Sequence, residues 1–156
     1  MDTQSLIALA KQIAGQYSLD PALVCAVIEQ ESSWNTWAIR FEPAFYEHYI
    51  QPMNLPPTEA YARSFSWGLM QVMGQTAREM LFRGDLASLC DPQTGIDIGC
   101  KVLASKLRMG GENLALGLEH YNGGANPGYA AAVMARMSHY QQASNHDSVQ
   151  AAAAGE

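Results

Sequence analysis

Two glutamates stand two positions apart at the end of an apolar segment, in the run VIEQESSWN at residues 27–35. On a helix of about 3.6 residues per turn, Glu31 shares a face with the apolar residues three, four and seven positions before it. Glu29 is rotated by about 200° from that face. We therefore expect Glu31 to point into the protein and Glu29 to lie on the solvated side.

A carboxyl group at position 31 has a specific chemical use. Partial burial and the negative end of the helix dipole both disfavour its charged form, so the pKa of Glu31 should be raised. A carboxyl group that stays protonated near neutral pH can act as a general acid, for example toward the oxygen of a glycosidic bond. The alternative is an end-of-helix side chain that reaches water or bonds to the backbone of Ser32 or Ser33.

The surrounding sequence predicts seven helical segments and no strand, which indicates an all-α domain. Three of the segments begin with a cap residue followed by proline, whose missing N–H costs nothing in the first turn. The segments are 5–17, 21–33, 58–63, 75–82, Asp91-Pro92 to Gly110-Gly111, 113–121, and Asn126-Pro127 through Tyr140.

Residues 35–57 break this pattern, because four prolines and many aromatic residues fall within them. The stretch is predicted to be a long irregular insert with at most a short helix near 43–50. Loops of this length in a compact domain are usually functional. The chain of 156 residues fits one domain, which we place at residues 1–142, with residues 143–156 as a frayed tail that has nothing to bury.

Composition excludes several classes of protein. The hydrophobic residues, 48% of the chain, are scattered without a run of eighteen, which excludes a membrane-spanning helix. Nine basic against fifteen acidic residues give a formal charge of −6, and no basic stripe is present, so nucleic acid is a poor candidate partner. Met1 and Asp2 lead into an amphipathic segment, so no secretory signal is visible, and a substrate outside the cytoplasm would require another route of delivery.

The cysteines and histidines do not indicate a disulfide framework or a metal site. Three cysteines without a CxxC pair argue against both a disulfide scaffold and a zinc knuckle. Cys25 and Cys100 are expected in the core, and a bridge between Cys90 and Cys100 remains open. The four histidines lack ligand spacing, so no metal site is expected; they are His48, His120, His139 and His146.

Three blocks occur in order along the chain: IEQESSWN at 28–35, SWGLMQVMGQTA at 66–77 and EHYNGG at 119–124. Together they resemble the soluble lytic transglycosylases, which share the lysozyme-like α-helical fold and cut peptidoglycan. The inserted RFEPAFYEHY at 40–49 resembles an element of small stand-alone enzymes of phage type. The resemblance implies an all-α lysozyme-like domain that acts on peptidoglycan glycan strands as a monomer without a cofactor. Delivery by a holin, a virion or a secretion system would fit the missing signal.

The resemblance also implies roles for individual residues. Glu31 matches the catalytic acid, and Ser32 matches the serine that fixes the turn through a hydroxyl-to-backbone bond. Gly68 would let backbone approach the saccharide closely. The residues expected to contact the substrate are Ser32, Ser66, Met70, Gln71, Tyr121, Asn122 and Tyr129.

These substrate contacts have different expected forms. Gln71 would offer an amide to a sugar N-acetyl group or to the acid, and the Tyr121 hydroxyl would lie near the acid. Asn122 would bond to sugar or backbone, or serve only as a helix stop. Tyr129 resembles a tyrosine that closes the cleft. Ser66 is inferred from its place and its chemistry and not from a matched residue, because Phe65-Ser66-Trp67 stands where the family often has Gly-Ala.

Met70 and Leu69 could instead be core residues. Trp34 and Trp67 are expected either to stack on sugar rings or to lie in the core.

The reaction implied by the resemblance needs one carboxyl group, because Glu31 first protonates the leaving oxygen and then deprotonates the muramic C6 hydroxyl. The product carries a 1,6-anhydro ring. A hydrolase would use a second carboxylate, for which Glu42 and Glu47 are candidates. The alternative for Glu42 is an ion pair with Arg40 or Arg63. A third hypothesis is a non-catalytic module that only binds the wall.

Overall fold

The computed structural model describes the backbone of residues 1–124 and 126–153, and the side chains as far as Gln141 with the exception of Ala125. This part of the chain is mostly helical, which confirms the all-α prediction. Its α-helices are α1 Thr3–Gln16, α2 Pro21–Ser32, α3 Pro43–Phe45, α4 Pro57–Arg63, α5 Gly74–Glu79, α6 Pro92–Met109, α7 Leu114–Asn122 and α8 Tyr129–Ala153.

The helix that carries Glu31 begins and ends where its sequence predicts. The Asp20 carboxylate accepts a hydrogen bond of 2.8 Å from the Ala22 N–H, and Pro21 occupies the first turn. Every residue from Ala22 to Ile28 is buried, so α2 is enclosed on all sides. The helix ends at Ser33, whose φ of 49° lies in the left-handed region.

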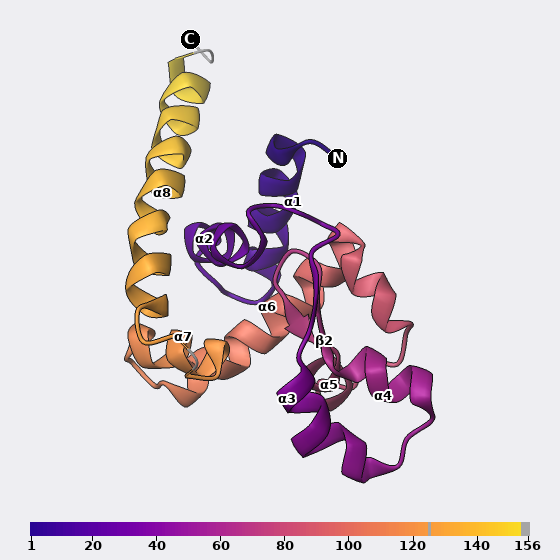
Figure 1. The fold of residues 1–156 in the computed structure, drawn as a ribbon. Helices are drawn as coiled ribbons and strands as arrows, with labels where there is room; N and C mark the ends of the chain where they lie inside the picture. The colour runs from indigo at the N-terminus through magenta and orange to yellow at the C-terminus, as the bar shows by residue number, and fades with distance from the viewer. Residues whose placement is uncertain (125, 154–156) are drawn as a thin grey trace.

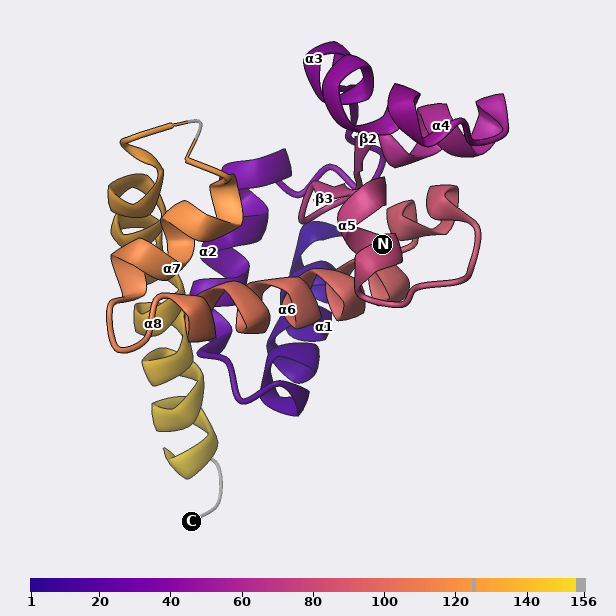
Figure 2. The same ribbon diagram turned by 90° about the horizontal axis from the view of Figure 1, so that it is seen from below.

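Long helices build the larger part of the molecule around α2. Figures 1 and 2 show α6 running across the centre, with α1 and α2 on one side of it. At one end of α6 the chain turns into α7 and then α8, which packs along α2. Side chains of α1, α2, α6 and α8 meet in one continuous hydrophobic core.

A smaller lobe lies at the other end of α6 and contains the predicted irregular insert (Figure 2). The short helix expected near 43–50 is confirmed as α3 followed by a π-helical turn, η1, at Tyr46–Ile50. The remaining short elements of the chain are the 3₁₀ turns η2 Gln51–Met53 and η3 Leu86–Cys90 and the strands β1 Ile39–Phe41, β2 Phe65–Trp67 and β3 Val72–Met73.

The three strands correct the prediction that the chain has none. They form an antiparallel sheet in the order β1-β2-β3, in which Ser66 faces Arg40 on one side and Met73 on the other. Strands of two or three residues are too short to show an alternating pattern. The pairing of β1 with β2 also joins segments about 26 residues apart, which no local pattern reports. The sheet joins β1 and β2 to β3, the strand that contacts α6.

Glu59 on α4 forms one salt bridge within its own helix, to Arg63, and one to Arg78, which holds α4 against α5 in this lobe. Its carboxylate accepts bonds of 2.8 Å from Arg63 and 2.7 Å from Arg78, and its side chain is 29% exposed. The hydrogen bond from Arg78 is the main reason that the pKa of Glu59 falls from 4.5 to about 2. The lobe should therefore depend on the charged form of Glu59.

Glu59→Gln is expected to lower the free energy of unfolding at pH 7 by about 2 kcal/mol, once solvent screening is allowed for. Because the folded pKa is depressed, this stabilisation is complete above pH 4.5 and is lost as the pH falls toward 2. Urea unfolding between pH 7 and pH 2 should show the difference between wild type and variant shrinking. Glu79→Gln, at an exposed carboxylate that accepts a bond from Gln75, is the control and should have little effect.

Two other predictions concern the cysteines and the tail. Cys25, Cys90 and Cys100 are free thiols in the core, so a bridge between Cys90 and Cys100 is not formed. The backbone of α8 continues as helix past the predicted domain end to Ala153. A frayed tail stays a prediction, because side chains from residue 142 onward lie outside the described part of the chain. In that part, no helix has the length and apolar character needed to cross a bilayer.

Candidate active site

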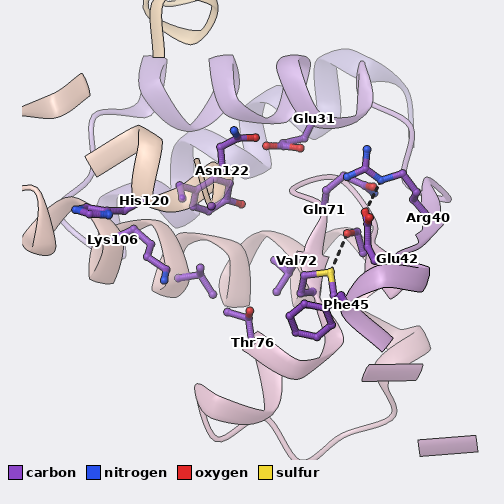
Figure 3. A pocket seen from close by; sticks show the side chains of 15 residues that line it. Glu31, Arg40, Glu42, Phe45, Gln71, Val72, Thr76, Lys106, His120 and Asn122 are labelled. Carbon is purple, nitrogen blue, oxygen red and sulfur yellow. Dashed lines mark hydrogen bonds and ion pairs between the residues drawn. The ribbon is translucent and has the colours of Figure 1, made fainter. Parts of the chain in front are cut away.

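A cavity of about 390 Å³ opens between the end of α2, the small lobe, α6 and α7. It brings together residues from all three sequence blocks, which are far apart in the chain (Figure 3). Its lining is made of Glu31, Arg40, Glu42, Phe45, Ser66, Gln71, Val72, Met73, Thr76, Val102, Lys106, His120, Tyr121, Asn122 and Gly123.

Glu31 projects from the last turn of α2 into this cavity (Figure 3). Burial raises its pKa, and this effect outweighs the opposing influence of a hydrogen bond from Tyr129 and of the charge of Arg40. The predicted inward orientation and raised pKa are thus confirmed. The Tyr129 hydroxyl donates to Glu31 Oε1 at 2.6 Å, which leaves Oε2 as the oxygen able to carry the proton.

Ser32 and the backbone of the second sequence block hold the end of α2 in place. The Ser32 hydroxyl has two carbonyl acceptors, Ile28 O at 3.1 Å in its own helix and Leu69 O at 2.8 Å. The predicted hydroxyl-to-backbone bond is therefore present and also joins α2 to the cavity wall. Ser32 is absent from the lining, so the structure places it in a supporting position, and its contact with substrate stays a prediction.

Met70 is a core residue, which corrects its predicted contact with substrate. Its side chain is fully buried, and it packs so closely on α6 that a Cβ at Gly99 would lie 2.3 Å from its sulfur. Its carbonyl oxygen accepts a bond of 2.7 Å from the Tyr121 hydroxyl. Met70 therefore supports the cavity from behind, and Tyr121, which lines it, is anchored to the same wall.

Gln71 lines the cavity, but both N–H groups of its side-chain amide are hydrogen-bonded to backbone carbonyls. Its backbone has a φ of 46°, and its Nε2 donates to Ala38 O at 3.0 Å and to Gly68 O at 2.9 Å. These two carbonyl acceptors fix the orientation of the amide, because the reverse orientation would place oxygen against oxygen. Gln71 can therefore offer only its carbonyl oxygen to a sugar, and it does not donate to the acid.

Ser66 and Asn122 reach the cavity from opposite walls. Ser66 is 3% exposed, and its hydroxyl lies 3.2 Å from the sulfur of Met73 on β3. Asn122 is the last residue of α7, and its Nδ2 is buried without a hydrogen-bond partner among the described residues. A buried donor without a partner is costly unless a ligand satisfies it. Asn122 is thus both the predicted helix stop and a donor available to a ligand.

Glu42 enters the cavity as half of an ion pair. Arg40 Nε lies 2.6 Å from Glu42 Oε1, which confirms one of the two partners predicted for Glu42, while Arg63 pairs with Glu59 instead. The other candidate second carboxylate, Glu47, is exposed and lies outside the lining. The cavity therefore holds one carboxyl group tied to an arginine and one, Glu31, that is bonded to a tyrosine.

The two tryptophans beside the motifs take the core alternative. Trp34 and Trp67 pack against the hydrophobic core, and neither belongs to the lining. The Trp34 Nε1 donates to the Tyr140 hydroxyl at 3.0 Å, and the Trp67 Nε1 donates to Ala62 O at 3.0 Å. These bonds fix the orientation of the two indole rings, which are partly buried.

Helix α8 contacts both glutamates of α2, which corrects the prediction for Glu29. The Tyr140 hydroxyl donates to Glu29 Oε2 at 2.6 Å, and Arg136 Nε lies 3.7 Å from Glu29 Oε1. The side chain of Glu29 is only 32% exposed, because α8 covers the face of α2 that periodicity assigned to solvent. Tyr129 and Tyr140 on one helix thus bond to Glu31 and Glu29 on the other.

The resemblance to the lytic transglycosylases implies that Glu31 is the catalytic acid. On that expectation Tyr129→Phe should lower kcat about tenfold, because Glu31 loses the hydrogen bond that orients it. That bond also favours the carboxylate, so its loss raises the pKa of Glu31 further. Since the acid must be protonated in the free enzyme, the alkaline limb of the kcat/KM profile should move to higher pH. Burial raises the pKa of Tyr129 itself, so that it stays a donor throughout.

Tyr17→Phe is the matched control for this prediction. It removes a comparable bond of 2.7 Å from a tyrosine to Asp97, outside the cavity. The pH profile of this variant should match that of the wild type. A similar shift in both variants would mean that the effect is not transmitted through Glu31.

The cavity also contains two basic residues to which the sequence analysis gave no role in the site: Lys106 on α6, and His120 of the third block on α7. Both lie in the last turn of a helix, where basic residues are common, so their residue types alone do not indicate a binding site. Only the packing of α6 against α7 brings the two together.

Comparison with known proteins agrees with this geometry. No solved structure matches the chain. The family model described as the transglycosylase SLT domain matches residues 8–132, a span that includes Glu31 and all the residues lining the cavity. The chain therefore belongs to the transglycosylase SLT domain family, whose reaction is the lytic-transglycosylase type of peptidoglycan cleavage.

Proposed function

We propose that this chain cleaves the β-1,4 bond between N-acetylmuramic acid and N-acetylglucosamine and leaves a 1,6-anhydro end, with Glu31 as the single acid and then base. The observation that supports this most directly is the environment of Glu31. It is the lining carboxyl group with a raised pKa and no ion-pair partner among the described residues, whereas Glu42 is held by Arg40.

The first step is protonation of the glycosidic oxygen by Glu31 Oε2 as the bond from that oxygen to C1 breaks. N-acetylglucosamine leaves as an alcohol, and the N-acetyl oxygen of the muramic residue carries the developing positive charge at C1. Tyr129 keeps its bond to Oε1 and so stabilises the carboxylate that Glu31 becomes.

The second step uses that carboxylate as the base. It removes the proton from the C6 hydroxyl of the muramic residue, whose oxygen then bonds to C1 and closes the anhydro ring. Glu31 ends the cycle protonated again, no water is consumed, and no cofactor takes part. A group that must be acid and base in turn is suited by a pKa raised toward the working pH.

Arg40 contributes to this balance between acid and base. Its charge opposes the rise in the pKa of Glu31, so it favours the carboxylate form that the second step requires. Its ion pair with Glu42 fixes the guanidinium in the wall of the cavity. Glu42 thus positions a cation in this proposal and has no role as nucleophile or as base toward water.

The test is mass spectrometry of the soluble fragments that the enzyme releases from purified peptidoglycan. A digest of the same peptidoglycan by a hydrolytic muramidase provides the reference masses. Fragments one water lighter than the reference support the proposal. Fragments with the reference masses would identify a hydrolase and direct attention to Glu42, and binding without any release would identify a module that only recognises the wall.

A further inference from the structure

The cavity has two differently charged ends, one on each side of Glu31. Figure 3 shows Arg40 and Glu42 on one side of the acid and Lys106 and His120 on the other. At the first end the charges cancel, because Arg40 and Glu42 form an ion pair of 2.6 Å. At the second end the lining contains no carboxylate, so the positive charge of Lys106 is not balanced there.

Lys106 and His120 form no hydrogen bond or ion pair within the described part of the chain. Both are half-buried, and they come from two packed helices, α6 and α7, so they do not depend on the position of a loop. An ammonium group has three donors to offer. A cation that a cleft holds without a counterion attracts an anionic group of a ligand.

We propose that Lys106, with His120 beside it, binds a carboxylate carried on the O3 substituent of the muramic residue. This inference rests on the proposed function, which supplies the glycan. The carboxylate has two sources: the lactyl group itself when it is free, and the peptide stem when one is attached. N-acetylglucosamine has no such substituent, so the two sugars of the repeat differ in what they offer to this end of the cavity.

The inference sets the direction of the strand in the cavity. The muramic residue whose C1–O bond breaks lies on the Lys106 side of Glu31, and the leaving N-acetylglucosamine lies toward Arg40 and Glu42. A reversed strand would place its carboxylate near Glu42 and leave Lys106 without a partner. Charge alone thus distinguishes the two orientations.

The experiment measures binding by calorimetry with every variant made in the Glu31→Gln background, so that the strands stay intact. Three preparations are compared: uncrosslinked strands with peptide stems, the same strands stripped by an amidase to expose the lactyl carboxylate, and stem-bearing strands with every carboxylate converted to a primary amide. Lys106→Gln is expected to weaken binding to a carboxylate-bearing preparation about tenfold. The effect should disappear on the amidated strands.

The two carboxylate-bearing preparations separate the two sources. If Lys106→Gln lowers the affinity only for stem-bearing strands, the contact is with the peptide. If it lowers the affinity for the stripped strands, the contact is with the lactyl group. Lys106→Arg keeps the charge and should retain most of the affinity. Arg108→Gln removes an exposed cation from the same turn of α6 outside the cavity and should not weaken binding.

The inference would be overturned if Lys106→Gln weakened binding to all three preparations equally, or if it did not weaken binding to any of them. The first result would give Lys106 only a structural role at the end of α6, and a lower melting temperature would accompany it. The proposed function fails by a different readout, the mass of the released fragments. Because affinity is measured without cleavage, the carboxylate dependence is decided whichever products the active enzyme forms.

Discussion

Replacement of Glu31 by glutamine is expected to slow glycan cleavage about 10³-fold, because in the proposed mechanism this side chain carries both proton transfers, and a general acid or base contributes about 10²–10⁴-fold. Glutamine is nearly isosteric and can still accept the bond from Tyr129, so the cavity should keep its shape. The rate is measured as release of soluble fragments from purified peptidoglycan, with folding checked by circular dichroism. The loss should fall on kcat more than on KM.

Glu29→Gln is the matched control, since it makes the same chemical change two residues earlier in the same helix. Glu29 lies outside the lining, and its carboxylate is bonded to Tyr140 and paired with Arg136. This variant should keep the wild-type rate and lose only stability. If both variants lost activity equally, the damage would lie in the packing of α2 against α8 and not in acid catalysis.

Glu42→Gln distinguishes a mechanism that uses one carboxyl group from a mechanism that uses two. In a reaction with a single carboxyl group, this change disturbs only the position of Arg40, so its effect should be well below that of Glu31→Gln. In a hydrolase that uses both carboxylates, the two losses would be of similar size. The comparison is independent of product analysis, because it depends on rates alone.

The position of Glu31 was predictable from the sequence because it depends on local rules. A cap and a proline at Asp20 and Pro21 set the start of α2, and the helical period then fixes which of the two glutamates continues the apolar face. The Ser32 bond to Ile28 is equally local. Where the neighbour lies within one turn, the pattern of residue types was sufficient.

Contacts between distant segments were not predictable in this way. Glu29 was assigned to solvent because periodicity describes one helix and cannot show that α8 covers its other face. Met70 stands in a motif for which the sequence analysis predicted contact with substrate. Its side chain is buried against α6, and this packing requires a glycine at position 99, because a Cβ there would overlap the Met70 side chain. Lys106 and His120 become one site only through the packing of α6 on α7.

Gly68→Ala is expected to lower the free energy of unfolding by about 3 kcal/mol or more, the sum of two separate costs. The backbone of Gly68 has a φ of 66°, which costs an L-residue about 1 kcal/mol. The added Cβ would also lie 2.2 Å from the carbonyl oxygen of Leu89, which is backbone and cannot rotate away as a side chain does. For a domain stable by about 5–15 kcal/mol, such a loss is large.

Gly68→Ala should also disturb the geometry of the candidate active site. Gly68 donates its N–H to Ala38 O at 2.7 Å, and its carbonyl oxygen accepts from the Gln71 amide at 2.9 Å. A shift of Gly68 away from Leu89 therefore displaces β1 and the cavity wall together. Activity of the folded fraction should fall as well, which distinguishes this site from a glycine needed only for stability.

Gly111→Ala isolates the first of the two costs. Its φ of 62° is nearly that of Gly68, but no atom lies within 4 Å of its added Cβ, so only the backbone penalty of about 1 kcal/mol applies. Urea unfolding of both variants measures the difference, which is the cost of meeting Leu89. If the two losses were equal, the close approach of Gly68 to η3 would not constrain the chain, and Gly68 would be required for its backbone conformation alone.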